Sequence, residues 1–249
     1  MPPIDYDHSR NLHTAAGPRE AFQEIFAAGL PRSLVDVGCG TGTWMKAALD
    51  AGIQDVFGVD GIAVPADTFL VPRSLFVQQD LTQPWDLGRR FDVALCLEVA
   101  EHLDESYAGT LLDVLTAHAD KIVFSAACPG QRGQHHVNCR WPDWWQRRFN
   151  DRGYVCDDSV RWRIWGNHSI EPWYRQNLFV ASHSPSSAGS EPRLPAVVHP
   201  DLLEDVAWDQ VVAKHLRQIE NGSQPVSWYL SRTFLAVARK CARATTFGR

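Results

Sequence analysis

Short apolar runs recur along the first 181 residues and predict the strands of a sheet. The runs are rich in Val, Ile, Leu and Phe, and polar or turn-forming residues bound them, which is typical of buried strands. The predicted strands are Ser33–Val37, Val56–Asp60, Leu75–Gln79, Phe91–Leu97, Lys121–Ala126, Tyr154–Asp157 and Asn177–Ala181.

Segments with the apolar spacing of helices lie between these runs. Helices are expected at Pro18–Ala28, Trp44–Ala51 and Tyr107–Ala117. Alternating strands and helices predict an α/β fold with a doubly wound, mostly parallel sheet. Ligands of such sheets bind beyond the carboxyl ends of the strands, so the polar residues at those ends are candidates for a site.

A stretch rich in Ser and Pro follows the last predicted strand and is expected to close the domain. Two segments with helical patterns come after it, at Leu202–Glu220 and Ser227–Ala244. We therefore expect a domain at 1–183 that begins with a lid and a helix, a linker at 184–200, and a helical C-terminal extension at 201–249. Apolar side chains in the extension would allow a homodimer; they include Leu230, Phe234, Leu235 and Val237.

Charge is unevenly distributed along the chain. Residues 222–249 hold five basic side chains and no acidic one, whereas the other 221 residues hold 19 basic and 29 acidic groups, a net charge of −10. Such an acidic body is a poor partner for nucleic acid, because neutralising phosphates takes clustered Lys and Arg. The simpler explanation of the basic tail is a solvated helix that packs on the acidic domain, and contact with a membrane surface or an anionic partner is the alternative.

The composition is that of an ordinary soluble globule, with 45% apolar and 21% charged residues. No apolar run approaches the roughly 18 residues of a membrane-spanning helix. The polar N-terminus, which carries acidic residues, argues against a signal peptide. None of the six cysteines forms a C-x-x-C pair, which favours a reduced, cytoplasmic protein.

A glycine-rich turn joins the first predicted strand to a helix, with the sequence Asp36-Val37-Gly38-Cys39-Gly40-Thr41-Gly42. Such a turn lets a nucleotide-like ligand contact backbone N–H groups at a helix N-terminus. The spacing is not the G-x-G-x-x-G of dehydrogenases, because Thr43 and Met45 stand where the last glycine would be.

This D-x-G-x-G-x-G spacing resembles the first motif of class I S-adenosylmethionine (SAM) dependent methyltransferases. The string Glu98-Val99-Ala100-Glu101-His102-Leu103 resembles the motif after their fourth strand. The resemblance covers residues 30–181 and implies a Rossmann-like fold, SAM as the cofactor and methyl transfer as the activity. The cofactor-binding residues that it implies are Asp36, Gly38, Gly40, Asp60, Asp80, Leu81 and Leu97.

Asp60 and Asp80 end the second and third predicted strands. A carboxylate at the position of Asp60 can accept both hydroxyls of a ribose that the glycine turn places within reach. The family resemblance places Asp80 beside the adenine amino group. The structural alternatives are a helix cap or turn at Asp60, before Gly61, and a turn at Asp80, before Leu81.

Candidate catalytic residues follow the fourth predicted strand. If a helix begins there, Glu98 and His102 share a face, and His102 could take a proton from an acceptor hydroxyl while a carboxylate orients it. Some methyltransferases that this string resembles use a divalent cation, so Glu98, Glu101 and His102 are also candidate ligands of Mg²⁺. Alternatively, the Glu-His pair caps the helix and braces the sheet.

A second candidate segment, at 129–138, follows the fifth predicted strand and carries His135 and His136. An ordinary hydroxyl needs a base while it lies in line with the methyl donor. His136 is favoured as that base, because the H-V-N string resembles a subgroup of bacterial methyltransferases near glycan-building enzymes. The alternatives are exposed loop histidines and a zinc site with Cys128 and Cys139, although this spacing matches no common zinc pattern.

Six of the ten tryptophans fall within 33 residues and alternate with polar side chains. Flat faces beside hydrogen-bonding groups suit sugar rings, and they would also suit a planar aromatic acceptor. Residues 141, 145 and 149 recur every four positions and are expected in the core. The candidate platform residues are Trp144, Trp162 and Trp165.

These observations predict a SAM-dependent O-methyltransferase acting on a hydroxyl of a sugar or short glycan, with Tyr6–His13 as a lid over the cofactor. Either His136 or His102 would be the base, and Glu98 would orient it or hold a metal. A small phenolic or polyketide acceptor is the alternative, and a phenol would tolerate loss of the base better because it ionises more easily. From another class, the chain could be a SAM-binding subunit that serves a glycosyltransferase without catalysis.

Overall fold

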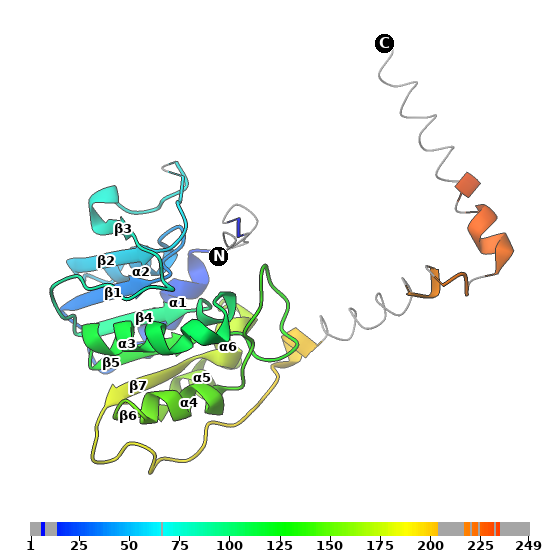
Figure 1. The fold of residues 1–249 in the computed structure, drawn as a ribbon. Coiled ribbons are helices and arrows are strands. Elements are labelled where there is room, and N and C mark those ends of the chain that lie inside the picture. The colour runs from blue at the N-terminus through cyan, green and yellow to red at the C-terminus, as the bar shows by residue number, and fades with distance from the viewer. Residues whose placement is uncertain are drawn as a thin grey trace. The chain divides into compact units, whose positions relative to one another are not determined.

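The computed structural model describes residues 6–7, 14–65, 67–203, 217–219, 221–223, 225–231 and 233–234 (Figure 1). The chain divides into two compact units, Met1–Leu203 and Glu204–Arg249. Among the described residues, no helix is both long and apolar enough to cross a membrane.

A seven-stranded sheet in the order β3-β2-β1-β4-β5-β7-β6 forms the centre of the first unit. Its strands are β1 (Ser33–Val37), β2 (Asp55–Asp60), β3 (Phe76–Gln78), β4 (Val93–Leu97), β5 (Lys121–Ser125), β6 (Tyr154–Asp157) and β7 (Phe179–His183). Strands β1 to β5 are parallel, and β7 is antiparallel to both of its neighbours. The carboxyl ends of the five parallel strands therefore meet at one edge, together with the amino end of β7.

Helices cover both faces of this sheet (Figure 1). One core layer contains residues of α1 (Ala16–Ile25), α2 (Thr43–Asp50), α5 (Ser159–Ile164) and α6 (Pro172–Asn177). The other layer contains residues of α3 (Ala108–His118) and α4 (Pro142–Asn150). Successive strand residues point to opposite layers, as Leu34 and Val35 do in β1. The predicted α/β fold with a doubly wound, mostly parallel sheet is confirmed.

Asn177 departs from its predicted place, because it ends α6 instead of beginning a strand. Pro172 at the first turn starts this short helix, where a missing N–H costs nothing. The strand β7 then begins at Phe179. Neither α5 nor α6 is long enough to show a helical period in the sequence, so the sequence predicts neither helix.

Residues 184–203 pack on the first unit, although the sequence predicts a linker at 184–200. Leu194 is buried, and its N–H donates to Oε1 of Gln146 at 2.8 Å. The Glu191 carboxylate accepts the amide of Asn150 at 2.6 Å. The linker assignment is therefore wrong: a few anchoring residues in a Ser- and Pro-rich stretch hold it against α4, and the unit ends near Leu203.

The second unit is described in part, and its helical residues are 217–219, 226–231 and 233–234. These lie within the two helices expected for the C-terminal extension, with Val226 one residue earlier than expected. Residues 204–216, 220, 224, 232 and 235–249 of the extension lie outside the described residues. So do His8–His13 of the expected lid.

Candidate active site

The glycine turn after β1 approaches its neighbours more closely than a side chain would allow. Gly38 has φ of +79°, in the left-handed region that glycine adopts without strain. A Cβ on Gly38 would lie 2.2 Å from Cγ2 of Val99. The turn is held by β2, because the N–H of Gly38 donates to the Val59 carbonyl at 2.7 Å and that of Gly40 to Oδ2 of Asp60 at 2.8 Å. This close approach explains why glycine is needed at the first position of the motif.

A cavity of about 830 Å³ lies at the edge where the parallel strands end. All ten residues that the sequence predicts for cofactor binding and catalysis line it: Asp36, Gly38, Gly40, Asp60, Asp80, Leu81, Leu97, Glu98, His102 and His136. The fold thus brings together side chains that lie up to 100 positions apart in the sequence.

Asp36 gives this cavity a buried carboxyl group at the end of β1. The residue is 2% exposed, and its Oδ2 atom has no hydrogen-bond partner among the described residues. Burial, with the charge of Asp60, raises the pKa of Asp36 to about 8. A buried, unpartnered carboxyl in a cavity wall fits a cationic ligand, and SAM carries both an ammonium and a sulfonium.

Asp60 and Asp80 make the turn contacts that the structural alternatives require, and both also line the cavity. Asp60 accepts the N–H groups of Gly40 and Ile62, each at 2.8 Å. Oδ1 of Asp80 accepts the N–H of Thr82 at 2.9 Å and its hydroxyl at 2.7 Å. These bonds fix the two carboxylates in place. Their contacts with ribose and adenine remain predictions.

Glu98 follows β4 with φ of +55°, an uncommon conformation for a residue other than glycine. Its carboxylate accepts the amide of Gln131 at 2.8 Å and that of Asn177 at 3.1 Å. The Asn177 amide also donates to Oε1 of Gln131 at 2.8 Å. Sequence reasoning missed both amides. The available signal was a polar residue just before an antiparallel strand, whose amino end lies at the same edge as the cavity.

The predicted pairing of Glu98 with His102 on one helix face is wrong. Ala100–His102 forms a single turn of 3₁₀ helix, and the left-handed backbone of Glu98 precedes it. His102 instead lies beside His136, with 5.1 Å between the ring centroids. The tight turn therefore gathers the side chains that follow Glu98 around the loop after β5.

Glu101, His102 and His136 form a cluster whose possible ligand atoms all lie within 4.8 Å of one another. Glu101 is fully buried, and neither of its carboxylate oxygens has a hydrogen-bond partner among the described residues. Burial and the charge of Glu98 raise the pKa of Glu101 well above its ordinary value. Such a carboxyl group holds a proton until a cation approaches it.

Both imidazoles of the cluster favour the neutral form. Burial, with His136 nearby, lowers the pKa of His102 to about 4, and burial also lowers the pKa of His136. Nδ1 of His136 lies 3.1 Å from the Gln131 carbonyl, and this contact assigns the ring proton to Nδ1. Nε2 of His136 is then left as an acceptor. Neutral imidazoles suit either proton transfer or metal binding.

His136 and His135 have different environments, as expected for neighbours in a loop. His135 has φ of +50°, is exposed and does not line the cavity. Nε2 of His136 packs on Gly133, where a Cβ would lie only 1.9 Å away. Among the described residues, no cluster of possible metal ligands includes Cys128 or Cys139, so the zinc alternative gains no support.

Tyr6 and Asp7, the described part of the expected lid, contact the catalytic end of the cavity. Tyr6 lines the cavity, and its ring packs against the His102 ring in a T-shaped contact with 4.7 Å between the ring centroids. The backbone of Asp7 exchanges two hydrogen bonds with the Gln134 side chain, at 3.2 and 3.1 Å. The N-terminal segment thus contacts two of the elements that carry the candidate catalytic residues.

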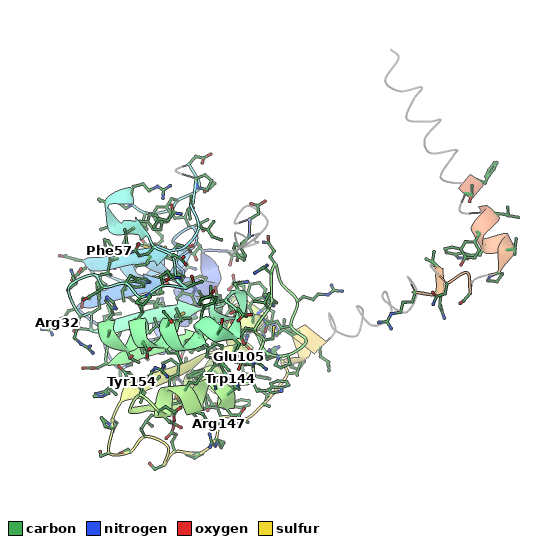
Figure 2. The ribbon with its side chains drawn as sticks, viewed as in Figure 1. Arg32, Phe57, Glu105, Trp144, Arg147 and Tyr154 are labelled. Carbon is green, nitrogen blue, oxygen red and sulfur yellow. The ribbon has the colours of Figure 1, made fainter. Side chains whose placement is uncertain are left out.

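The tryptophans predicted as a platform do not line the cavity. Trp144 lies on α4 (Figure 2). The Arg148 guanidinium is 3.1 Å from its ring centroid. Trp162 stacks on Trp165 with 5.0 Å between centroids. Trp173 of α6 lines the cavity instead. The sequence spacing alone did not show which tryptophans face the strand ends.

The strand order, the glycine turn and the cavity define a class I methyltransferase fold. Residues 6–163 match the family model described as a methyltransferase domain, which covers more than half of the chain. The protein belongs to this family and is a SAM-dependent methyltransferase. No match was found among curated proteins.

Solved structures of methyltransferases share the fold at low sequence identity. The methyltransferase domain of the bacterial protein CtHen1 is 16% identical, with a TM-score of 0.53, over 68% of this chain and 98% of that one. The sugar N-methyltransferase KedS8 from Streptoalloteichus is 16% identical, with a TM-score of 0.53, over 71% and 90%. The plantazolicin methyltransferase BpumL, crystallised with S-adenosylhomocysteine, is 14% identical, with a TM-score of 0.51, over 72% and 88%. These similarities show the fold and not the acceptor.

Proposed function

We propose that the protein methylates a hydroxyl of a sugar or short glycan, with His136 as the general base. The observation that carries this proposal is the neutral imidazole of His136 in the cavity wall, with its proton on Nδ1 and an acceptor at Nε2. A sugar hydroxyl is a weak nucleophile and needs such a base, which contributes about 10²- to 10⁴-fold to a rate.

The same cavity supports a definite arrangement of the cofactor. SAM supplies an activated methyl group on its sulfonium. In the proposal, Asp36 holds the amino group, Asp60 the ribose and Asp80 the adenine, while Leu81 and Leu97 line the walls. The turn at Gly38 and Gly40 contributes backbone N–H groups. These assignments put the methyl group toward Glu98, His102 and His136.

The cluster of Glu101, His102 and His136 also fits a divalent cation such as Mg²⁺. The two unpartnered carboxylate oxygens of Glu101 support this, because a cation would satisfy both and displace the proton. A cation here would make an acceptor hydroxyl more acidic. In that case His136 would bind the cation instead of acting as the general base, and the cation would activate the acceptor hydroxyl.

Two features of the cavity and one structural neighbour support a sugar as the acceptor. The cavity is large for a ligand site, at the upper end of a usual range of about 300–1,000 Å³, which leaves room for an acceptor beside the cofactor. Trp173 and Tyr6 supply aromatic faces beside polar side chains. One structural neighbour, KedS8, is a sugar N-methyltransferase. A phenolic acceptor, or a SAM-binding subunit without catalysis, is the competing proposal.

The test is methyl transfer from labelled SAM to mannose- and glucose-based oligosaccharides and to simple phenols, with and without a chelator. Label on a saccharide supports the proposal, and chelator sensitivity decides between the base and the metal. Label only on phenols would overturn the sugar acceptor. Bound SAM with no label on any acceptor would favour the non-catalytic subunit.

The substitution Gly133→Ala tests whether methyl transfer depends on the position of His136, because it leaves the imidazole in the chain. The added Cβ would overlap Nε2 of His136, so the ring must move, and we expect transfer to fall at least tenfold. Gly166→Ala is the matched control, because a Cβ there meets open space. Equal activity of the two variants would show that His136 need not keep its position.

A further inference from the structure

The C-terminal unit carries a row of exposed apolar side chains on one helix. Within this unit, residues 226–231 and 233–234 are helical, and Val226, Leu230 and Phe234 are 73%, 66% and 74% exposed. Their spacing of four residues puts them on one face. Three large apolar side chains this exposed on one face mark an interaction surface.

The start of this helix is well defined by the sequence. Gly222 ends the preceding helix in the left-handed conformation, with φ of +69°. Pro225 follows and suits the first turn of the next helix, where its missing N–H has no partner to lose. The Tyr229 hydroxyl donates to the Ile219 carbonyl at 2.9 Å, which ties the new helix to the previous one.

The charge of residues 222–249 indicates which kind of partner would bind this helix. The sequence from 222 to 249 contains no acidic residue, and its basic residues are Arg232, Arg239, Lys240, Arg243 and Arg249. Apolar side chains on a helix within a basic stretch are typical of segments that bind anionic lipid.

We propose that the helix from Pro225 binds the surface of an anionic lipid bilayer, with Val226, Leu230 and Phe234 buried at the interface. A bilayer supplies hydrocarbon for the row and negative headgroups for the basic side chains. A second copy of the chain would cover the row but would also bring its own five positive charges against the first five. The inference does not depend on the proposed acceptor.

The test is co-sedimentation of the full chain with phospholipid vesicles. We expect binding to vesicles with about 30 mol % phosphatidylglycerol, binding at least tenfold weaker to pure phosphatidylcholine, and loss of binding as salt rises to about 0.5 M. The triple variant V226Q/L230Q/F234Q keeps charge and helix propensity, and we expect its affinity for anionic vesicles to fall at least tenfold.

The matched control is L30Q/L70Q, which changes two exposed apolar residues of the first unit, 49% and 47% exposed. It should bind vesicles like the wild type, and SAM affinity should stay unchanged in both variants. No binding to anionic vesicles, or equal binding by the triple variant, overturns the proposal. So does a wild-type dimer that the triple variant converts to monomer, since the row would then join two copies.

Discussion

Asn177 shows how much a single amide can decide at this site. It is 2% exposed, and its side-chain amide donates both to the carboxylate of Glu98 and to Gln131. Because Glu98 has a left-handed backbone, its position depends on such partners rather than on a regular element. Hydrogen bonds to a charged group are stronger than neutral ones. Asn177 therefore acts as a positioning residue for Glu98.

Replacing Asn177 by Ala should slow methyl transfer about tenfold, which corresponds to about 1.4 kcal/mol. The reason is that Glu98 loses one of its two amide partners and leaves its place in the cavity wall. Turnover with a saccharide from the acceptor panel measures this, with SAM affinity followed by calorimetry. Asn150→Ala is the control, since that amide donates to Glu191 instead of Glu98. The same loss in both variants would mean that Asn177 acts only through stability.

At the scale of elements, the segment after β7 is part of the first unit. The first part of this segment bonds to α4 and β6 and supplies Leu194 to the apolar layer formed with α3 and α4, whereas Pro195, His199 and Asp201 bond to α5 and α6. Glu191 accepts hydrogen bonds from Gln146, Asn150 and the Cys156 backbone. A stretch without regular secondary structure thus stabilises one edge of the sheet through a few buried contacts.

Leu194→Ala should lower the free energy of unfolding by about 2–3 kcal/mol, because it leaves a cavity in a packed layer. Chemical denaturation of the full chain measures this. Leu203→Ala, at a side chain 54% exposed, should change the free energy by less than about 0.5 kcal/mol. If Leu194→Ala is as mild as Leu203→Ala, the segment would be a linker after all.

At the scale of the whole molecule, two acidic side chains that the sheet brings together affect the binding of the cofactor. Asp36 and Asp60 approach each other at the ends of adjacent strands, and burial and this repulsion raise the pKa of Asp36 to about 8. Asp36 is therefore protonated at neutral pH when the cavity holds no cation. A cationic ligand favours the carboxylate and lowers this pKa, so binding must release a proton below pH 8.

SAM affinity should accordingly rise with pH between about 6.5 and 8, by at most tenfold per unit, and level off above 8. Burial lowers the pKa of both imidazoles of the cluster, which moves their titration away from this window. Calorimetry in two buffers with different ionisation enthalpies measures the released proton. Asp36→Asn should remove both the proton release and the slope. An affinity that is flat from 6.5 to 8 would contradict the raised pKa.

Much of the site could be predicted because parallel strands follow a simple rule. Asp36 and Asp60 lie at the carboxyl ends of parallel strands, and Asp80 and Glu98 follow two others, so finding the strands also placed these residues at one edge. Gly38 was predicted from the motif resemblance, and its close approach to Val99 explains why that position admits no side chain. The rule does not apply to Asn177, because this residue precedes an antiparallel strand.

The resemblance of two motifs to a known family indicated the cofactor class, and the sequence by itself determined the α/β architecture and the edge where the site lies. Apolar periods and turn residues carry the information on architecture and site edge locally, within a few positions of the chain. Only the tertiary structure decided that His102 pairs with His136, that Glu101 is buried without partners, and that Trp173 faces the cavity. These features depend on contacts between distant segments and on the removal of water from them, and neither leaves a pattern in neighbouring residues.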